Sequence, residues 1–207
     1  MAKLPQESGK QSGRIVGRRY RYTEDYQTAP ALGENGRGKR VFYVGPWILP
    51  RIAPELYKKT VLLVWLLTAL VVAAAAAALA VLPTPMTHKW YVPILVFGLF
   101  PLSYQVMGAV MIPPEIKHME RQRYDKSIVR AGQSAIFTFA VICASALGCA
   151  IYWLVAALGT VEDEAPYALA DGVFAALLVL AALAELAVRR LIGRIEVDTL
   201  DHDAYRP

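Results

Sequence analysis

The sequence predicts an all-α integral membrane protein: four transmembrane helices in one antiparallel bundle, preceded by a mostly disordered N-terminal cytoplasmic arm. The first observation behind this is a set of four long apolar stretches, at residues 60–82, 91–112, 135–158 and 167–188. Each has about the 20 residues that a helix needs to cross a hydrocarbon core of about 30 Å. In addition, 56% of the chain is hydrophobic and only 19% is charged, which is unusual for a soluble domain.

The second observation is that lysine and arginine fall almost entirely on one side of the predicted spans. The segment before residue 60 holds 12 of them, the loop 113–134 holds five and the C-terminal end holds four, whereas the other two loops hold only Lys89. The positive-inside rule assigns the side with 21 of the 22 basic residues to the cytoplasm. Both termini are then cytoplasmic, which requires an even number of spans. We therefore expect a multi-pass protein of the plasma membrane.

Three parts follow from this topology: a basic arm (1–59), a transmembrane domain (60–192) and a cytoplasmic tail (193–207). The arm carries a net charge of +7 and few aliphatic residues before residue 40, so alone it cannot bury enough surface to fold. Basic and aromatic residues alternate in its segment 17–22. Next to a membrane, anionic headgroups at the cytoplasmic face are the expected partner of this arm, and nucleic acid is not.

An apolar patch at residues 40–50 is the part of the arm expected to be ordered. Its first residues favour an extended backbone that Gly45 and Pro46 would end, and Pro54 suits the start of the first long helix. Because the patch lies beside the membrane, it is a candidate docking surface. Its candidate docking residues are Val41, Phe42, Tyr43 and Trp47.

The second span is the irregular one. Pro101 lies near its middle and removes one backbone hydrogen bond, which predicts a kink. Ser103, Tyr104 and Gln105 follow almost at once. Such polar side chains can satisfy the freed backbone groups or bond to another helix. The alternative is a solute or ion path lined by Tyr104 and Gln105.

The fourth span contains two acidic residues. Glu185 is followed at the i+4 position by Arg189, which predicts a structural ion pair close to the inner interface. Asp171 lies one turn inside the outer end and is expected to reach the surface. In the outer loop, the acidic residues 162–164 are expected to be solvated.

Loops and small residues predict how the spans pack. Short outer loops make spans one and two, and spans three and four, antiparallel neighbours. Six consecutive alanines at 73–78 predict close helix packing, and a homo-oligomer interface is the sharper alternative. The loop 113–134 reads as a helix from about residue 115 to 130 that Gly132 would end. It is amphipathic along the inner surface, an extension of the third span, or a solvated linker helix.

The sequence contains no motif that identifies an enzyme. His88, His118 and His202 share no metal-ligand spacing, and no phosphate-binding loop is encoded. No cofactor is therefore expected. The leading hypothesis is a non-enzymatic accessory or interaction subunit of a plasma-membrane assembly, with a membrane-protein partner or a second copy of the chain. Small-solute or ion permeation, with Tyr104, Gln105 and Glu185 as lining, is the alternative.

Overall fold

The computed structural model describes residues 22–30, 39–81, 89–157 and 168–200. The chain divides into two compact units, residues 1–45 and residues 46–207. Several expectations fall outside the described residues. They concern the basic segment 17–21, the outer acidic residues 162–164, and the histidines at 88 and 202.

The first unit contains an antiparallel hairpin. Strand β1 (Tyr26–Pro30) pairs with β2 (Lys39–Tyr43), which places Tyr26 opposite Tyr43 with 5.3 Å between the ring centroids. The extended backbone expected from residue 41 onward is therefore β2. Residues 26–30 form β1, although the sequence placed them in the disordered arm, because β2 supplies the hydrogen-bonding partner and cross-strand side chains that this segment lacks alone.

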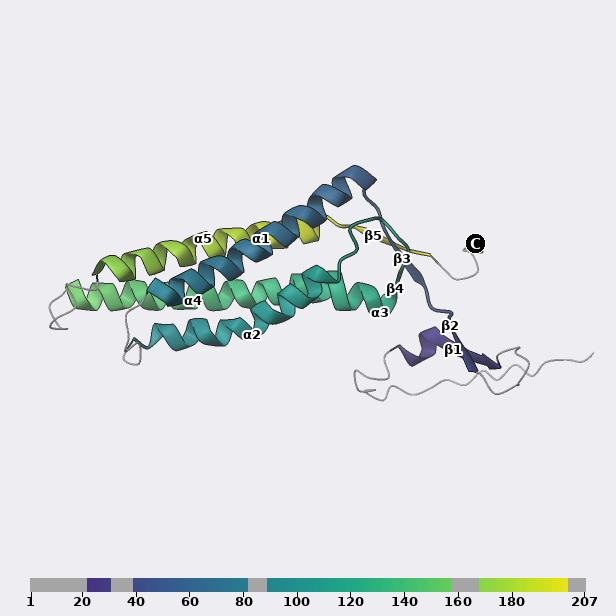
Figure 1. Ribbon diagram of the computed structural model, residues 1–207, viewed down its shortest axis with the longest axis horizontal. Helices are drawn as coiled ribbons and strands as arrows, with labels where there is room; N and C mark the ends of the chain where they lie inside the picture. The colour runs from purple at the N-terminus through teal and green to yellow at the C-terminus, as the bar shows by residue number, and fades with distance from the viewer. Residues whose placement is uncertain (1–21, 31–38, 82–88, 158–167, 201–207) are drawn as a thin grey trace, which may run out of the picture. The chain divides into compact units, whose positions relative to one another are not determined.

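The second unit contains four long helices packed antiparallel (Figure 1), and this confirms the predicted fold class. All four have the length and composition needed to cross a membrane. Their ends lie within a few residues of the predicted ones, and the first begins at Pro54 as expected. The helices are α1 (Pro54–Val81), α2 (Tyr91–Val110), α4 (Arg130–Ala157) and α5 (Ala168–Gly193).

The main helix contacts are α1 with α5, α2 with α4, and α4 with α5. The expected pairing of spans three and four is confirmed, whereas α1 and α2 touch far less than their short connection suggested. Small residues explain the extensive contacts, because Ala74, Ala75 and Ala78 of α1 are buried with Ala181 and Ala184 of α5. Close packing of the alanine run is therefore confirmed.

Two apolar clusters fill the interior of the bundle. The sheet-side core lies near the start of α1 and includes Val61, Val64 and Val188. The distal core lies toward the other end of the bundle. It includes Val71 of α1, Leu95 of α2 and buried residues of α4 and α5. Both cores draw residues from all four long helices.

The outer surface of the bundle is apolar, and polar side chains lie inside. Phe97 and Phe100 of α2 are each 69% exposed, whereas Gln105 and Glu185 are completely buried. A soluble bundle has the reverse arrangement, because exposing large apolar patches to water is unfavourable. Lipid is the solvent that suits this surface.

The loop 113–134 is mostly helical and continues into the third span. After the two-residue strand β4 (Met119–Glu120), helix α3 (Arg121–Tyr124) and a π-helical segment (Asp125–Val129) lead directly into α4. Extension of the third span is confirmed, but the helix begins at Arg121 and not near residue 115, and it continues past Gly132 into α4. A π-helical segment inside a helix often marks a functional position.

A three-stranded antiparallel sheet lies at one end of the bundle (Figure 1), in the order β4-β3-β5. The central strand β3 (Trp47–Pro50) pairs with β4 on one side and with β5 (Val197–Leu200) on the other. The sheet thus joins the segments before α1, between α2 and α3, and after α5. Within the second unit, every described lysine and arginine except Lys89 lies in these segments or in the adjoining ends of the helices.

Candidate functional site

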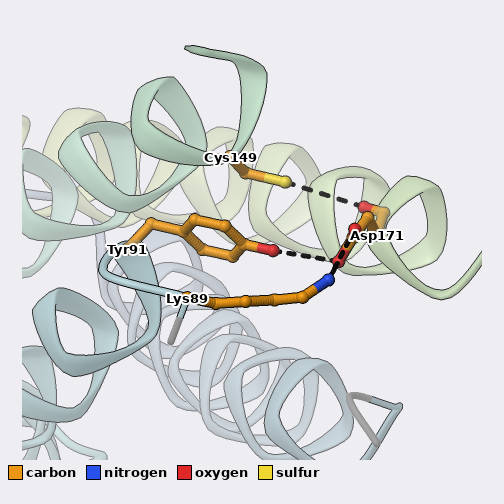
Figure 2. Close-up of polar contacts among 4 residues, drawn as sticks. All are labelled: Lys89, Tyr91, Cys149 and Asp171. Atoms are coloured by element: carbon orange, nitrogen blue, oxygen red, sulfur yellow. Dashed lines mark hydrogen bonds and ion pairs between the residues drawn. The ribbon is translucent and has the colours of Figure 1, made fainter. Parts of the chain in front are cut away.

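A buried ion pair closes the bundle at the end opposite the sheet. The Lys89 ammonium donates to both carboxylate oxygens of Asp171, at 2.8 Å to Oδ1 and 2.7 Å to Oδ2. The Tyr91 hydroxyl donates to the same Oδ1 at 2.9 Å. Figure 2 shows the side chains of Lys89 and Tyr91 converging on the Asp171 carboxylate, with Cys149 of α4 pointing at the Asp171 backbone oxygen.

Three helices position this group. Lys89 and Tyr91 flank the start of α2, Asp171 lies in the first turn of α5, and Tyr152 of α4 places its ring 5.3 Å from the Lys89 ammonium. Lys89 and Asp171 are only 4% and 2% exposed. The two charges neutralise each other, and both carboxylate oxygens accept hydrogen bonds. We therefore interpret the group as one that links the helix ends and stabilises the fold.

Sequence reasoning missed this group. The expectation that Asp171 reaches the surface is wrong, because the first turn of α5 faces the start of α2 and not solvent. A signal was present: Lys89 is the one basic residue between the first two spans, and Asp171 is an acid inside a span at the same end. Opposite charges at one depth of a bundle favour a pair.

The second buried polar group lies deeper, between α2 and α5. The Gln105 amide nitrogen donates to Oε2 of Glu185 at 3.0 Å, and both side chains are 0% exposed. Within the described residues, the amide oxygen Oε1 of Gln105 and the second carboxylate oxygen Oε1 of Glu185 have no hydrogen-bond partner. This group is therefore incompletely satisfied, in contrast to the ion pair at the bundle end.

The predicted ion pair between Glu185 and Arg189 is wrong. Glu185 points into the bundle and contacts Gln105, whereas Arg189 is exposed one turn further along α5. Spacing of i+4 allowed the contact, but a long arginine side chain near a helix end extends to the polar surroundings instead. Glu185 thus keeps no cationic partner among the described side chains.

The polar residues of the second span point in different directions. The Ser103 hydroxyl donates to the backbone oxygen of Phe100 at 2.7 Å, as expected for a side chain that satisfies backbone groups near Pro101. Tyr104 is 56% exposed, with the Arg130 guanidinium 5.9 Å from its ring. A path lined by both Tyr104 and Gln105 is therefore wrong, since only Gln105 faces the interior. Helix α2 changes direction along its length (Figure 1), which agrees with an internal proline.

The four candidate docking residues divide between the two units. Val41 and Phe42 are exposed on β2, and Tyr43 is half-buried against Tyr26. Trp47 belongs to β3, where its ring lies 6.4 Å from that of His118. The exposed apolar part of the patch is therefore Val41 and Phe42 alone.

A pocket of about 420 Å³ lies beside the sheet, between α1, the end of α2 and α3 with the π-helical segment. Trp65 and Met111 give it an apolar wall, and Arg123 and Lys126, together with the acidic Glu120, give it a charged wall that is basic on balance. The Trp65 indole nitrogen donates to the Ala109 backbone oxygen at 2.7 Å, which fixes that wall. An amphipathic ligand with a negative head fits this lining.

Comparison with models of protein families, with curated proteins and with solved structures gave no match. Among the described residues, no group of three histidine, cysteine, aspartate or glutamate side chains is arranged as a metal site requires. The buried polar groups and the pocket described above are therefore the candidate functional sites.

Proposed function

We propose that the chain is a non-enzymatic accessory subunit of the plasma membrane, whose cytoplasmic end binds anionic lipid headgroups within a larger membrane assembly. The observation that carries this proposal is that the basic residues described in the second unit, apart from Lys89, lie in the sheet segments or at the helix ends next to them. Positive charge concentrated there favours the cytoplasmic side for that end, and hence for both termini.

The basic pocket supplies the specific contact. A phosphate near Arg123 and Lys126 would form charge-assisted hydrogen bonds, while the acyl chain would lie along Trp65 and Met111. Basic residues near an anionic membrane surface contribute about 1 kcal/mol each. The pocket lies at the helix ends, which is the depth at which headgroups are found.

A protein partner would use the exposed apolar residues of the hairpin. Val41 and Phe42 are 63% and 49% exposed on β2, and the basic residues Lys39 and Arg40 precede them. Exposed apolar side chains of this kind are typical of interaction surfaces. We assign to them the contact with a membrane-protein partner or a second copy of the chain.

Replacing Arg123 and Lys126 by alanine is expected to weaken binding of anionic lipid about tenfold or more, because two charge-assisted hydrogen bonds to the phosphate are lost. The measurement is the thermal midpoint of the protein in neutral detergent as phosphatidylserine is titrated in. The matched control is Lys58→Ala with Lys59→Ala, which removes two exposed charges of α1 that do not line the pocket. Equal losses for the two double variants would contradict a specific pocket.

Permeation of a small solute or ion is the second candidate, and the buried Gln105–Glu185 contact is the observation that favours it. Gln105→Leu is expected to abolish flux in proteoliposomes if this candidate is right, because it removes the polar group that Glu185 contacts. Ser103→Ala is the control, since Ser103 lies on the exposed side of the same helix. Undiminished flux in the Gln105 variant would exclude this lining.

A further inference from the structure

Each of the four long helices places one buried polar side chain where the sheet-side core meets the distal core. We call these four residues the polar layer. They are Thr68 on α1, Gln105 on α2, Thr138 on α4 and Glu185 on α5, and they are 0–3% exposed.

The position of the layer follows from the order of core residues along each helix. In every case the polar residue separates members of the sheet-side core from members of the distal core. Since the helices run antiparallel, this order reverses from one helix to the next, yet the boundary stays at one level. The flanking core residues are Val64 and Val71 on α1, Ala109 and Leu102 on α2, Ala135 and Ile142 on α4, and Val188 and Ala184 on α5.

The layer holds four oxygen atoms without hydrogen-bond partners among the described residues. They are the hydroxyl oxygens of Thr68 and Thr138 and the Oε1 atoms of Gln105 and Glu185. A buried polar atom left unpartnered is unfavourable, and helical threonine ordinarily bonds to its own backbone. One such oxygen on every helix at the same level therefore indicates a binding site inside the bundle.

The surroundings of Glu185 indicate which ligand the polar layer would bind. An ionised carboxylate in a membrane interior needs a counter-charge, and the described residues bring none to it. Gln105 turns its amide nitrogen toward Oε2, so its oxygen does not join the carboxylate in surrounding a metal cation. Oε1 of Glu185 has no hydrogen-bond partner among the described residues, and a proton there would neutralise the acid and remove its need for a counter-charge.

We propose that Glu185 is a reversible proton-binding site at the middle of the bundle. The carboxylate takes up one proton on Oε1 to become the neutral acid, and releases it again without other bond changes. Gln105 donates to Oε2 in both states. Buried carboxyls of this kind are typical of proton relays in membrane proteins.

Other titratable groups lie away from the layer. On α1 the nearest is Lys59, nine residues or about 14 Å from Thr68 along the helix axis. On α4, Cys143 lies five residues from Thr138 and Arg130 eight, and on α2 Tyr104 faces outward while Tyr91 bonds to Asp171. On α5, Arg189 is exposed. A titration inside the bundle at this level therefore belongs to Glu185.

Infrared difference spectroscopy of the purified protein in nanodiscs tests the proposal, because a protonated carboxyl has a C=O band that the carboxylate lacks. We expect a band that falls as pH is raised, that shifts in D₂O and that is lost in Glu185→Gln. Glu55→Gln, at an exposed carboxylate in the first turn of α1, is the control and should leave the band unchanged. A pH-dependent carboxyl signal equal in wild type and Glu185→Gln would overturn the proposal.

A second variant keeps the test decisive if Glu185→Gln does not fold. Gln105→Leu removes the donor to Oε2, so the C=O band should move to higher frequency while it still titrates. An unchanged band would overturn the assigned geometry. All spectra are repeated with choline in place of sodium. A signal that depends on sodium at fixed pH would show a metal cation at the layer and overturn proton binding.

Discussion

Lys89→Met is expected to destabilise the bundle by about 3–5 kcal/mol, which is the usual effect of removing one partner of a buried ion pair. The loss leaves the Asp171 carboxylate uncompensated at 2% exposure, and among the described side chains only the Tyr91 hydroxyl still donates to it. Reversible unfolding in mixed micelles, followed by circular dichroism, measures the change in the free energy of unfolding. The variant should unfold at markedly lower denaturant.

Two further variants separate the ion pair from the loss of a lysine. Lys117→Met removes a 68% exposed ammonium that lies 3.7 Å from Glu115, and should change stability by about 0–1 kcal/mol. Lys89→Met combined with Asp171→Leu removes both charges and should recover much of the lost stability, since no buried charge remains unpaired. A double variant as unstable as Lys89→Met alone would contradict the buried-charge explanation.

The architecture was predictable because hydropathy and charge act on whole segments. Twenty apolar residues in a row have one low-energy environment, and the asymmetry of lysine and arginine does not depend on which helices touch. The strand expected from Val41 was predictable for a related reason, because its β-branched and aromatic residues favour extended backbone locally.

The contacts of single side chains were not predictable, because they depend on helix neighbours far apart in the sequence. Lys89 and Asp171 are 82 residues apart, and nothing local indicates that the start of α2 faces the first turn of α5. For Glu185 the local i+4 rule predicted Arg189 as the partner. In the structure Glu185 bonds instead to Gln105, which is 80 residues away in the sequence. Gln105 was identified as a candidate, and its partner was not.

Thr68 and Thr138 illustrate a different limit of prediction from the sequence. A threonine in an apolar helix is ordinary, since its hydroxyl can bond to the backbone one turn earlier. Only the packed bundle shows that both hydroxyls are buried and lack partners among the described residues. The polar layer is a property of four helices at one level, and no single helix sequence contains it.

Gly108→Val is expected to destabilise the bundle by about 1–3 kcal/mol through overpacking. A Cβ atom at this position of α2 would lie 2.7 Å from the backbone nitrogen of Ala131 and 3.0 Å from the backbone oxygen of Ser127. Backbone atoms cannot turn aside as a flexible side chain does, so α2 and the start of α4 must move apart. The same unfolding measurement in mixed micelles gives the loss.

Gly193→Ala is the matched control, because a Cβ atom there meets nothing within 4 Å. It should leave the free energy of unfolding nearly unchanged. If both glycine variants were equally stable, the close approach of α2 and α4 would be contradicted. If only Gly108→Val is destabilised, we expect an effect on Gln105 as well, because Gln105 lies three residues away on the same face of α2. Separating these helices should then loosen the Gln105–Glu185 contact, so the strain at Gly108 and the infrared signal of Glu185 would change together.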